Sequence, residues 1–312
     1  MRKVTTMTDI VEPVITWVLG RLTLPGHSRA TLAGAAGLRE GSNPWMLRLD
    51  DGRSVVLRVG DPDDEEQRTG FGVEARLLEI AEQHGVPTSR LIAYDPSGAD
   101  AGALALLSTV VEGSSRIPEE PTPELLIEYG RAAVTLRGVP LGALDGMPRR
   151  VRPIEGVDFE GARRRQGASS LLLAAEAAIA ERPVPEREPG LVHGDLWLGN
   201  TMWVGPRLSG FVDWDCAGIG DPGLDVASIR MDAALLFGAE YAEAVLSGYL
   251  AASGRERVED LAYWDVVAAL STPPTMAEFE PAIQDQGRPD LDRATLEERR
   301  DAFLRAALDR LG

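Results

Sequence analysis

The sequence has little of three side-chain types that often carry chemistry. Its 312 residues include one lysine, Lys3, one cysteine, Cys216, and three histidines. A Walker A phosphate loop ends in Gly-Lys-Ser/Thr, so such a loop is excluded, as is a lysine Schiff base beyond the extreme N-terminus. Three histidines exclude a His-rich metal centre. A single cysteine excludes an intrachain disulfide and fits a reducing cytoplasm. We expect Cys216 to be a small, buried, apolar side chain rather than a nucleophile.

Long apolar runs and positive charge are also scarce. No run approaches the ~18–20 apolar residues of a membrane-spanning helix, and Asp9 and Glu12 interrupt the N-terminal segment, so we expect neither a membrane span nor a signal peptide. The formal net charge is −17. Nucleic-acid binding needs clustered lysine and arginine, so this charge argues against it and is compatible with a cationic small-molecule substrate. We therefore expect a cytoplasmic protein with no nucleic-acid or membrane partner.

One stretch, residues 193–213, contains three polar side chains suited to phosphoryl transfer. Asp195 is followed five residues later by Asn200 and thirteen residues after that by Asp213. Phosphoryl transfer requires a carboxylate that orients the attacking hydroxyl group and oxygen ligands that hold Mg²⁺ on the nucleotide phosphates. A lone pair of acids would indicate only a polar loop, whereas three such groups at these spacings favour a catalytic site.

A predicted hairpin explains how two of these residues meet. Residues 200–204 and 209–213 have the pattern of short strands, and Gly205-Pro206 marks a turn between them. Pairing the strands about this turn sets Asn200 opposite Asp213, close enough for one cation to bridge them. The sequence therefore predicts a Mg²⁺ site shared by these two side chains, with Asp215 left open as a further metal contact or a solvated acid.

The same stretch resembles a known family. His193-Gly194-Asp195-Leu196, with Asn200 four residues further on, resembles the catalytic loop of protein kinases with glycine at its second position. That glycine and the following Val212-Asp213-Trp214 resemble the aminoglycoside phosphotransferase and choline kinase branch of the superfamily. The segment 221–227, Asp-Pro-Gly-Leu-Asp-Val-Ala, resembles a segment that follows in the same branch.

The resemblance implies an enzyme and assigns its parts. It implies a small-molecule kinase that uses ATP or GTP with Mg²⁺, in which Asp195 is the catalytic base and Asn200 and Asp213 ligate the metal. Asp225 would be structural and bond to the backbone of the catalytic loop. We expect His193 to order that loop by hydrogen bonding rather than to transfer a proton.

The order of the predicted elements gives the fold class, α+β. Strands dominate up to about residue 111, around one amphipathic helix with apolar positions from Val73 to Ala81, and helices dominate afterwards except at 190–213. The resemblance implies a protein-kinase-like two-lobed fold. Its parts would be an N-terminal nucleotide-binding lobe with a small antiparallel sheet (1–109), a hinge (110–113) and a mainly helical C-terminal lobe with the catalytic loop and acceptor site (114–312).

The element boundaries follow from periodicity and from turn residues. In the first lobe the pattern predicts a helix at 8–22 that packs on that lobe, and a solvated acidic loop at 61–66. It predicts strands at 45–48, 54–59, 91–94 and 103–111. In the second lobe it predicts helices at 124–136, 169–180, 224–250, 258–270 and 295–311.

The resemblance also assigns a nucleotide site in the first lobe. Arg58 lies on a strand that resembles the one carrying the phosphate-binding lysine of protein kinases, and Glu74 resembles the acid that holds that basic residue. Arginine in place of lysine keeps the charge and can bind two phosphate oxygens, although its geometry differs. The alternative is that Arg58 and Glu74 are separate surface charges.

Two backbone segments complete the predicted nucleotide site. The turn at 41–43, with Ser42 and Asn43, is a candidate for covering the phosphates, although it lacks a full Gly-rich motif and also fits an ordinary hairpin tip. The backbone from Thr109 to Val111 would offer hydrogen-bonding groups to adenine if it forms the hinge.

The acceptor is the least determined part of the prediction. The region 276–301 carries eight acids against four arginines, which would attract ammonium groups on a substrate or would simply face solvent. We expect a hydroxyl-bearing small molecule, foremost an aminoglycoside-type antibiotic or related amino sugar. Alternatives are another antibiotic of macrolide type or a metabolite alcohol and, in another class, a catalytically silent kinase-like binding protein. A protein kinase is disfavoured by Gly194 and by Val212-Asp213-Trp214.

Overall fold

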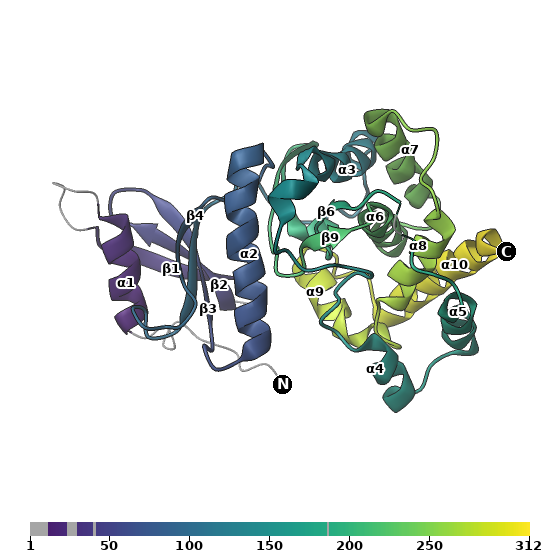
Figure 1. Cartoon of the computed structure of the whole chain (residues 1–312), viewed down its shortest axis with the longest axis horizontal. Coiled ribbons are helices and arrows are strands. Elements are labelled where there is room, and N and C mark those ends of the chain that lie inside the picture. Colours follow the sequence, from purple (N-terminus) through teal and green to yellow (C-terminus); the bar gives the residue numbers. More distant parts are fainter. Residues whose placement is uncertain (1–11, 24–29, 40–41, 186) are drawn as a thin grey trace. The chain divides into compact units, whose positions relative to one another are not determined.

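The first third of the chain combines five strands with two helices, and helices predominate over strands in the rest (Figure 1). The structure is a computed structural model that describes residues 12–23, 30–39, 42–185 and 187–312. Contacts between Cα atoms divide the chain into two units, residues 1–83 with 87–111 and residues 84–86 with 112–312. Within the described ranges, no helix is long and apolar enough to cross a membrane.

The first unit is built on one antiparallel five-stranded sheet. Its strands run in the order β1-β2-β3-β5-β4. Their bounds are Leu32–Arg39 (β1), Ser42–Leu49 (β2), Ser54–Gly60 (β3), Leu91–Asp95 (β4) and Leu104–Thr109 (β5). A turn around Gly52 joins β2 to β3, and Gly52 has a φ of 86°, which suits glycine because it has no Cβ. The antiparallel sheet expected for this lobe is confirmed.

One helix lies on each face of this sheet (Figure 1). Helix α1 (Glu12–Leu22) buries Val14, Trp17 and Val18 against inward side chains that include Leu47 and Leu57, as its apolar stripe predicted. Side chains alternate along a strand, so Arg58, which follows Leu57 in β3, lies on the opposite face. That face is covered by helix α2 (Glu65–His84).

Helix α2 begins earlier than its apolar pattern indicated. The acidic run 61–66 was expected to be a loop, but Glu65 and Glu66 form the first turn of the helix. Asp64 is the reason, because its carboxylate accepts a hydrogen bond from the backbone N–H of Gln67 (3.1 Å) and another from the Gln67 side chain (2.7 Å). An acid at this position satisfies a backbone donor that the first helical turn leaves without a partner.

The second unit is mainly helical. Its helices are Pro123–Thr135 (α3), Phe159–Gln166 (α4), Ser170–Ala180 (α5), Gly223–Leu236 (α6), Tyr241–Ser253 (α7), Leu261–Leu270 (α8), Glu280–Asp285 (α9) and Arg293–Leu311 (α10). Two pairs of short antiparallel strands accompany them, β6 (Gly190–Val192) with β9 (Gly218–Gly220), and β7 (Thr201–Val204) with β8 (Arg207–Phe211). The sequence prediction missed α4, α9 and β9.

Helix α6 is the central helix of this unit, and thirteen of its fourteen residues are buried. The single helix expected over 224–250 is wrong, because the chain turns between α6 and α7. Gly238 lies in this turn with a φ of 132°, a conformation that other residues rarely adopt. Apolar residues continue on both sides of the turn, which is why periodicity alone suggested one helix.

Candidate active site

Strand β6 leads directly into the segment 193–200, which we call the catalytic loop. Its last three residues form a short 3₁₀ turn, Leu198–Asn200, before β7 begins at Thr201. The side-chain amide nitrogen of Asn200 donates to the main-chain oxygen of Asp195 (2.9 Å) and to its carboxylate Oδ2 (3.0 Å). The loop therefore brings two of the three predicted site residues into direct contact.

The predicted hairpin is present, with its register shifted by one residue. Strands β7 and β8 pair antiparallel with Thr201 opposite Phe211, and an irregularity lies between Met202 and Trp203. The N–H of Val212 donates to the carbonyl oxygen of Asn200 (2.9 Å). Asn200 therefore lies opposite Val212, and not opposite Asp213 as expected. The cause is the short turn, which pairs Val204 with Arg207, and the extra residue in β8 recovers only part of this difference.

The donor atoms at this end of the hairpin fit a magnesium ion. The nitrogen of the Asn200 amide faces Asp195, so its oxygen is the atom suited to a cation. Asp213, which has a φ of 68°, follows Val212 and adds a carboxylate. No cluster of three or more Asp, Glu, His or Cys side chains that could hold a metal occurs in the described part of the chain. Two oxygen ligands fit Mg²⁺, which usually keeps substrate phosphates and water among its ligands.

His193 is a fixed, neutral part of the loop. Its ring is fully buried, and burial lowers the pKa of His193 to about 4. Its Nε2 lies 3.1 Å from the carbonyl oxygen of Val212, while its Nδ1 accepts from the N–H of Asp195 (3.4 Å). A neutral imidazole with its proton on Nε2 satisfies both contacts. The ring also packs against Trp214, with centroids 4.4 Å apart, so the ordering role expected for His193 agrees with its contacts.

Asp225 on α6 holds the start of the catalytic loop. Its two carboxylate oxygens accept from the N–H groups of His193 (2.7 Å) and Gly194 (3.0 Å). Burial raises the pKa of Asp225 to about 6, although both hydrogen bonds act in the opposite direction. Gly194 has a φ of 79°, and a Cβ there would lie 2.1 Å from the carbonyl oxygen of Cys216. Bonding of Asp225 to the loop backbone, implied by the resemblance, is therefore present.

A second carboxylate of α6 also reaches the catalytic loop. Oδ2 of Asp232 accepts from the N–H of Leu198 (3.0 Å) and from the hydroxyl of Tyr129 on α3 (2.9 Å). The sequence prediction missed this residue. Its signal was the spacing from Asp225, because residues seven apart lie two turns apart on one face of a helix.

Cys216 lies near the acids of the site, which disfavour its thiolate form. Burial raises the pKa of the Cys216 thiol far above its usual range, and the nearby Asp215, Asp195 and Asp213 act in the same direction. A thiol held protonated is a poor nucleophile. A nucleophilic role is therefore disfavoured, while the buried apolar role expected for Cys216 stays a prediction, because the side chain is only half-buried.

In the first unit, Arg58 and Glu74 form an ion pair. The guanidinium group of Arg58 contacts the Glu74 carboxylate, and the two side chains are 17% and 8% exposed. The same guanidinium lies 4.9 Å from the ring centroid of Phe71, one turn earlier on α2. The alternative that Arg58 and Glu74 are separate surface charges is therefore wrong, while the phosphate-binding role of Arg58 stays a prediction.

The remaining predictions for the nucleotide site concern Ser42, Asn43 and the backbone at Thr109. Both ends of the Asn43 amide bond the backbone of Val59 (2.9 and 3.0 Å), so this side chain ties β2 to β3 beside Arg58. Ser42 opens β2, and Gly41 lies outside the described residues. The N–H of Thr109 donates to the carbonyl of Arg90 (2.9 Å), so that group is already used in the sheet.

Phosphate coverage by Ser42 and Asn43, and adenine binding at Thr109 and Val111, therefore stay predictions. In the case of Asn43 only the backbone is left for that role, because its side chain is committed to Val59.

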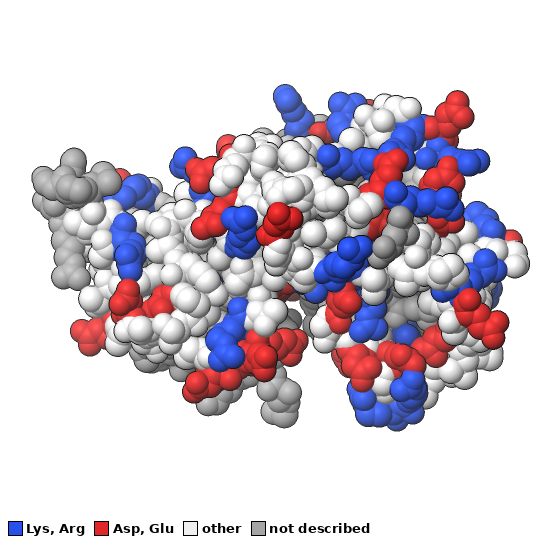
Figure 2. All heavy atoms as spheres, in the orientation of Figure 1, with Lys and Arg blue, Asp and Glu red and all other residues white. Residues whose placement is uncertain are grey.

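Most acids of the region 276–301 have structural partners. Asp292 caps α10 through the N–H of Thr295 (2.8 Å), Asp290 pairs with Arg288 (2.7 Å), and Glu297 accepts from the N–H of Met276 (3.1 Å). On the face drawn in Figure 2, acidic and basic side chains are interspersed among the described residues. These contacts favour a local structural role over a substrate-attracting one for most of this region.

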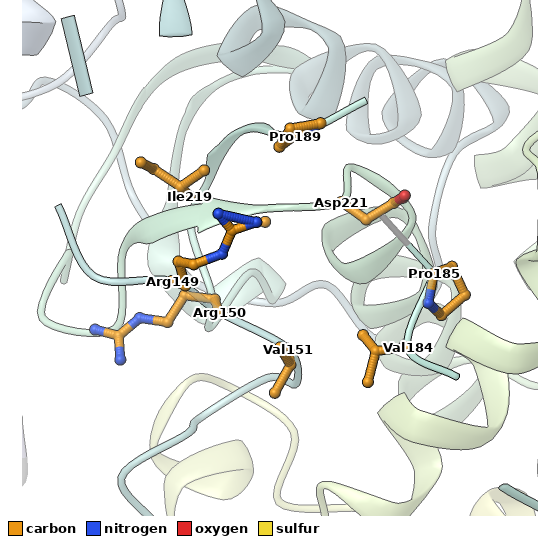
Figure 3. Close-up of a pocket in the computed structure, with 9 residues that line it drawn as sticks. Arg149, Arg150, Val151, Val184, Pro185, Pro189, Ile219 and Asp221 are labelled. Atoms are coloured by element: carbon orange, nitrogen blue, oxygen red, sulfur yellow. The ribbon is translucent and has the colours of Figure 1, made fainter. Parts of the chain in front are cut away.

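A pocket near β6 and β9 is too small for a substrate. It lies between Pro189 and Ile219 on one side and Val151 and Val184 on the other (Figure 3). Its volume of about 10 Å³ corresponds to about one water molecule. This pocket is therefore not a binding site for an antibiotic.

Comparison with known proteins identifies one family and several related folds. Residues 36–261, more than half of the chain, match the model of the phosphotransferase enzyme family. A viomycin phosphotransferase from Streptomyces vinaceus is 43% identical over 75 residues. That stretch is 23% of this chain and 23% of the relative, so the match spans about a quarter of the relative's length.

Two solved structures share the fold at low sequence identity. A candidate aminoglycoside phosphotransferase from Ralstonia eutropha has a TM-score of 0.65 at 16% identity, over 96% of this chain and 98% of that chain. The aminoglycoside phosphotransferase APH(3'')-Id from Streptomyces rimosus, in complex with ADP and streptomycin, has a TM-score of 0.53 at 18% identity, over 72% and 92%. These similarities confirm the predicted kinase-like α+β fold.

Proposed function

The chain belongs to the phosphotransferase enzyme family, and on that premise we propose that it is a small-molecule kinase. It transfers the γ-phosphoryl group of ATP, or of GTP, to a hydroxyl group of an aminoglycoside-type antibiotic or related amino sugar. The observation that carries this proposal is the contact between Asn200 and Asp195 on a loop held by Asp225. We assign the reaction to the cytoplasm, where the single thiol stays reduced.

Asp195 acts on the acceptor hydroxyl group. Its carboxylate orients that hydroxyl toward the γ-phosphorus and takes its proton as the new O–P bond forms and the bond to the β-phosphate oxygen breaks. The Asn200 amide, 3.0 Å from Oδ2, holds the carboxylate in one orientation. The neutral, buried His193 takes no part in proton transfer and fixes the Asp195 backbone.

Asn200 and Asp213 would hold Mg²⁺ through one amide oxygen and one carboxylate. When bound, this ion neutralises charge on the β- and γ-phosphates. The two protein ligands come from a 3₁₀ turn and from the residue after Val212, and the hydrogen bond from Val212 to Asn200 couples their backbones. Their spacing is thus set by main-chain geometry, which is stiffer than that of long side chains.

Arg58 is the proposed contact to the α- and β-phosphates. Glu74 and Phe71 fix its guanidinium on the α2 face of the sheet, so little side-chain entropy remains to be lost when a nucleotide binds. Arginine presents several donors in a planar fork, which suits two phosphate oxygens.

An amino-sugar acceptor is supported by charge and by relatives. The net charge of −17 attracts cations over long range. The Streptomyces rimosus structure is a complex with streptomycin. The viomycin phosphotransferase matched over 75 residues supports an antibiotic acceptor, but it does not favour an amino sugar over other antibiotics. The acids of 276–301 contribute less than their number suggested, because several have local partners.

The test is nucleotide consumption with acceptor-product detection. The purified protein is incubated with Mg²⁺ and either ATP or GTP across aminoglycosides, viomycin, a macrolide and neutral sugars, and products are scored by mass spectrometry for one added phosphoryl group. Asp195→Asn serves as the background control. Phosphorylation of an aminoglycoside supports the proposal. Phosphorylation of only a macrolide or a neutral sugar would overturn the acceptor class, and no acceptor-dependent turnover would overturn the kinase itself.

A further inference from the structure

Two acids of α6 bond the catalytic loop at two separate points. Asp225 bonds the N–H groups of His193 and Gly194, and Asp232 bonds the N–H of Leu198. Their separation of seven positions corresponds to about 10 Å along the helix axis. One rigid, buried helix thus reaches both the start of the loop and the 3₁₀ turn that ends in Asn200.

The residues of this 3₁₀ turn are buried, and Leu198 also borders a pocket on one side. Leu198 borders a cavity of about 180 Å³, which is also lined by Leu125 and Trp203. Tight packing is what normally holds interior side chains in place, and the pocket reduces packing on this side of the turn. The hydrogen bond from the Leu198 N–H to Asp232 adds a directional restraint on the backbone of the turn.

The Asp232 carboxylate is itself held from a second helix. The hydroxyl of Tyr129 donates to the same oxygen, Oδ2, that accepts from Leu198. The Tyr129 ring is fully buried and packs edge-on against Trp203, with centroids 6.2 Å apart. Two donors on one oxygen, one from α3 and one from the loop, leave that oxygen a single position.

We propose that Asp232, fixed by Tyr129, is a positioning residue for phosphoryl transfer: it sets the backbone of Leu198–Asn200, and through it the Asn200 side chain. Asn200 bonds Asp195 and is the proposed metal ligand, so an error in this turn displaces both. The inference rests on the proposed function for its effect on turnover, while the clamp itself is a property of the fold.

Burial makes the carboxyl group a costly choice for a purely structural role. Burial raises the pKa of Asp232 to about 7, although the bonds from Leu198 and Tyr129 lower it. An uncharged group of the same shape would avoid the cost of burying a charge. Substitution of Asp232 should therefore affect the free energy of unfolding and the turnover rate differently. That difference separates a positioning role from a merely structural one.

The experiment compares three variants with a matched control. Asp232→Leu removes the acceptor, Asp232→Asn keeps one acceptor oxygen, and Tyr129→Phe removes only the hydroxyl. Tyr249→Phe is the control, because Tyr249 is equally buried and bonds Arg137 rather than the catalytic loop. Each variant is measured for kcat, for the Mg²⁺ concentration giving half-maximal rate, for unfolding in urea, and for hydrogen exchange of the Leu198 amide.

Asp232→Leu is expected to lower kcat by roughly ten- to a hundredfold per folded molecule, the scale of one lost charge-assisted hydrogen bond, and to raise the Mg²⁺ requirement. Asp232→Asn is expected to keep most of the wild-type kcat, and Tyr129→Phe to lower kcat by less than about tenfold. The control Tyr249→Phe is expected to have the kcat of the wild type. Leu198 exchange accelerates in Asp232→Leu.

Unchanged kcat, Mg²⁺ dependence and exchange in folded Asp232→Leu would overturn the inference, as would a rate loss that merely follows the unfolded fraction. A wild type without phosphotransfer would overturn the proposed function alone, and Leu198 exchange would still decide whether Asp232 holds the turn.

Discussion

Replacing Asp225 by Asn should separate the stability of the protein from its activity. The wild-type carboxylate accepts two backbone N–H groups, from His193 and Gly194, while it is almost completely buried. Asparagine has the same shape, but it offers one acceptor oxygen and presents an NH₂ group to the other N–H. One backbone donor therefore faces another donor, and the loop must move to separate them.

The two energetic consequences nearly cancel in the folded protein. The pKa of Asp225 rises from its ordinary 3.8 to about 6, so keeping the group charged in the fold at pH 7 costs about 3 kcal/mol, at about 1.4 kcal/mol per pKa unit. Asparagine removes this cost, whereas an unsatisfied buried N–H costs about 1–3 kcal/mol. The free energy of unfolding should thus change by less than about 2 kcal/mol. A loop displaced by about 1 Å can lower kcat by about 10²-fold.

The assay is a urea titration followed by circular dichroism beside a steady-state phosphotransfer measurement at saturating nucleotide. The wild-type stability contribution from protonated Asp225 is present at low pH and is lost as the pH rises from about 4 through about 6. The variant lacks this loss, so its stability relative to the wild type should improve by about 3 kcal/mol between pH 4 and pH 7. A kcat within threefold of wild type, or a constant stability difference across this range, would refute the reasoning.

Three further predictions concern the other parts of the site. Arg58→Ala should raise the KM for the nucleotide and lower kcat, with Glu74→Ala acting less strongly in the same direction, and unchanged kinetics for Arg58→Ala would exclude phosphate binding there. Asp213→Ala should abolish Mg²⁺-dependent nucleotide binding in calorimetric titration, and Asn200→Ala should weaken it less. A wild-type nucleotide affinity in Asp213→Ala would contradict the metal assignment. Because the folded-state pKa of His193 is lowered from 6.5 to about 4, wild-type stability should fall by about 3 kcal/mol as the pH drops from 6.5 to 4, and His193→Gln should lack this component in urea titrations.

The contacts that were predictable from sequence are those between motif residues. Asp225 was expected to bond the loop backbone, and it bonds His193 and Gly194. Arg58 was matched to Glu74 by position, and the two side chains form an ion pair. In these cases the chemistry constrains both the residue type and its spacing, so the contact can be predicted from the sequence alone.

The errors have a different physical origin. The hairpin turn is shorter than expected, because Val204 pairs with Arg207, and a bulge between Met202 and Trp203 offsets only one residue of that difference. Neither the turn length nor the bulge leaves a mark in a short run of strand-forming residues. The turn at Gly238 divides a run of apolar residues that periodicity treats as one helix. Asp232 was overlooked because its partners, Leu198 and Tyr129, come from separate segments of the chain. The seven-residue spacing from Asp225 places Asp232 on the same helix face, but it does not indicate these partners.

The most direct test of the account is the turnover of Asp195→Asn with the best acceptor found for the wild type. The substitution keeps the shape of the side chain and removes the charge that takes the hydroxyl proton. The account predicts a fall in kcat of about 10²–10⁴-fold, with nucleotide affinity largely retained. Retention of more than half of the wild-type kcat would contradict the assignment of Asp195, and with it the central claim that the catalytic loop performs phosphoryl transfer.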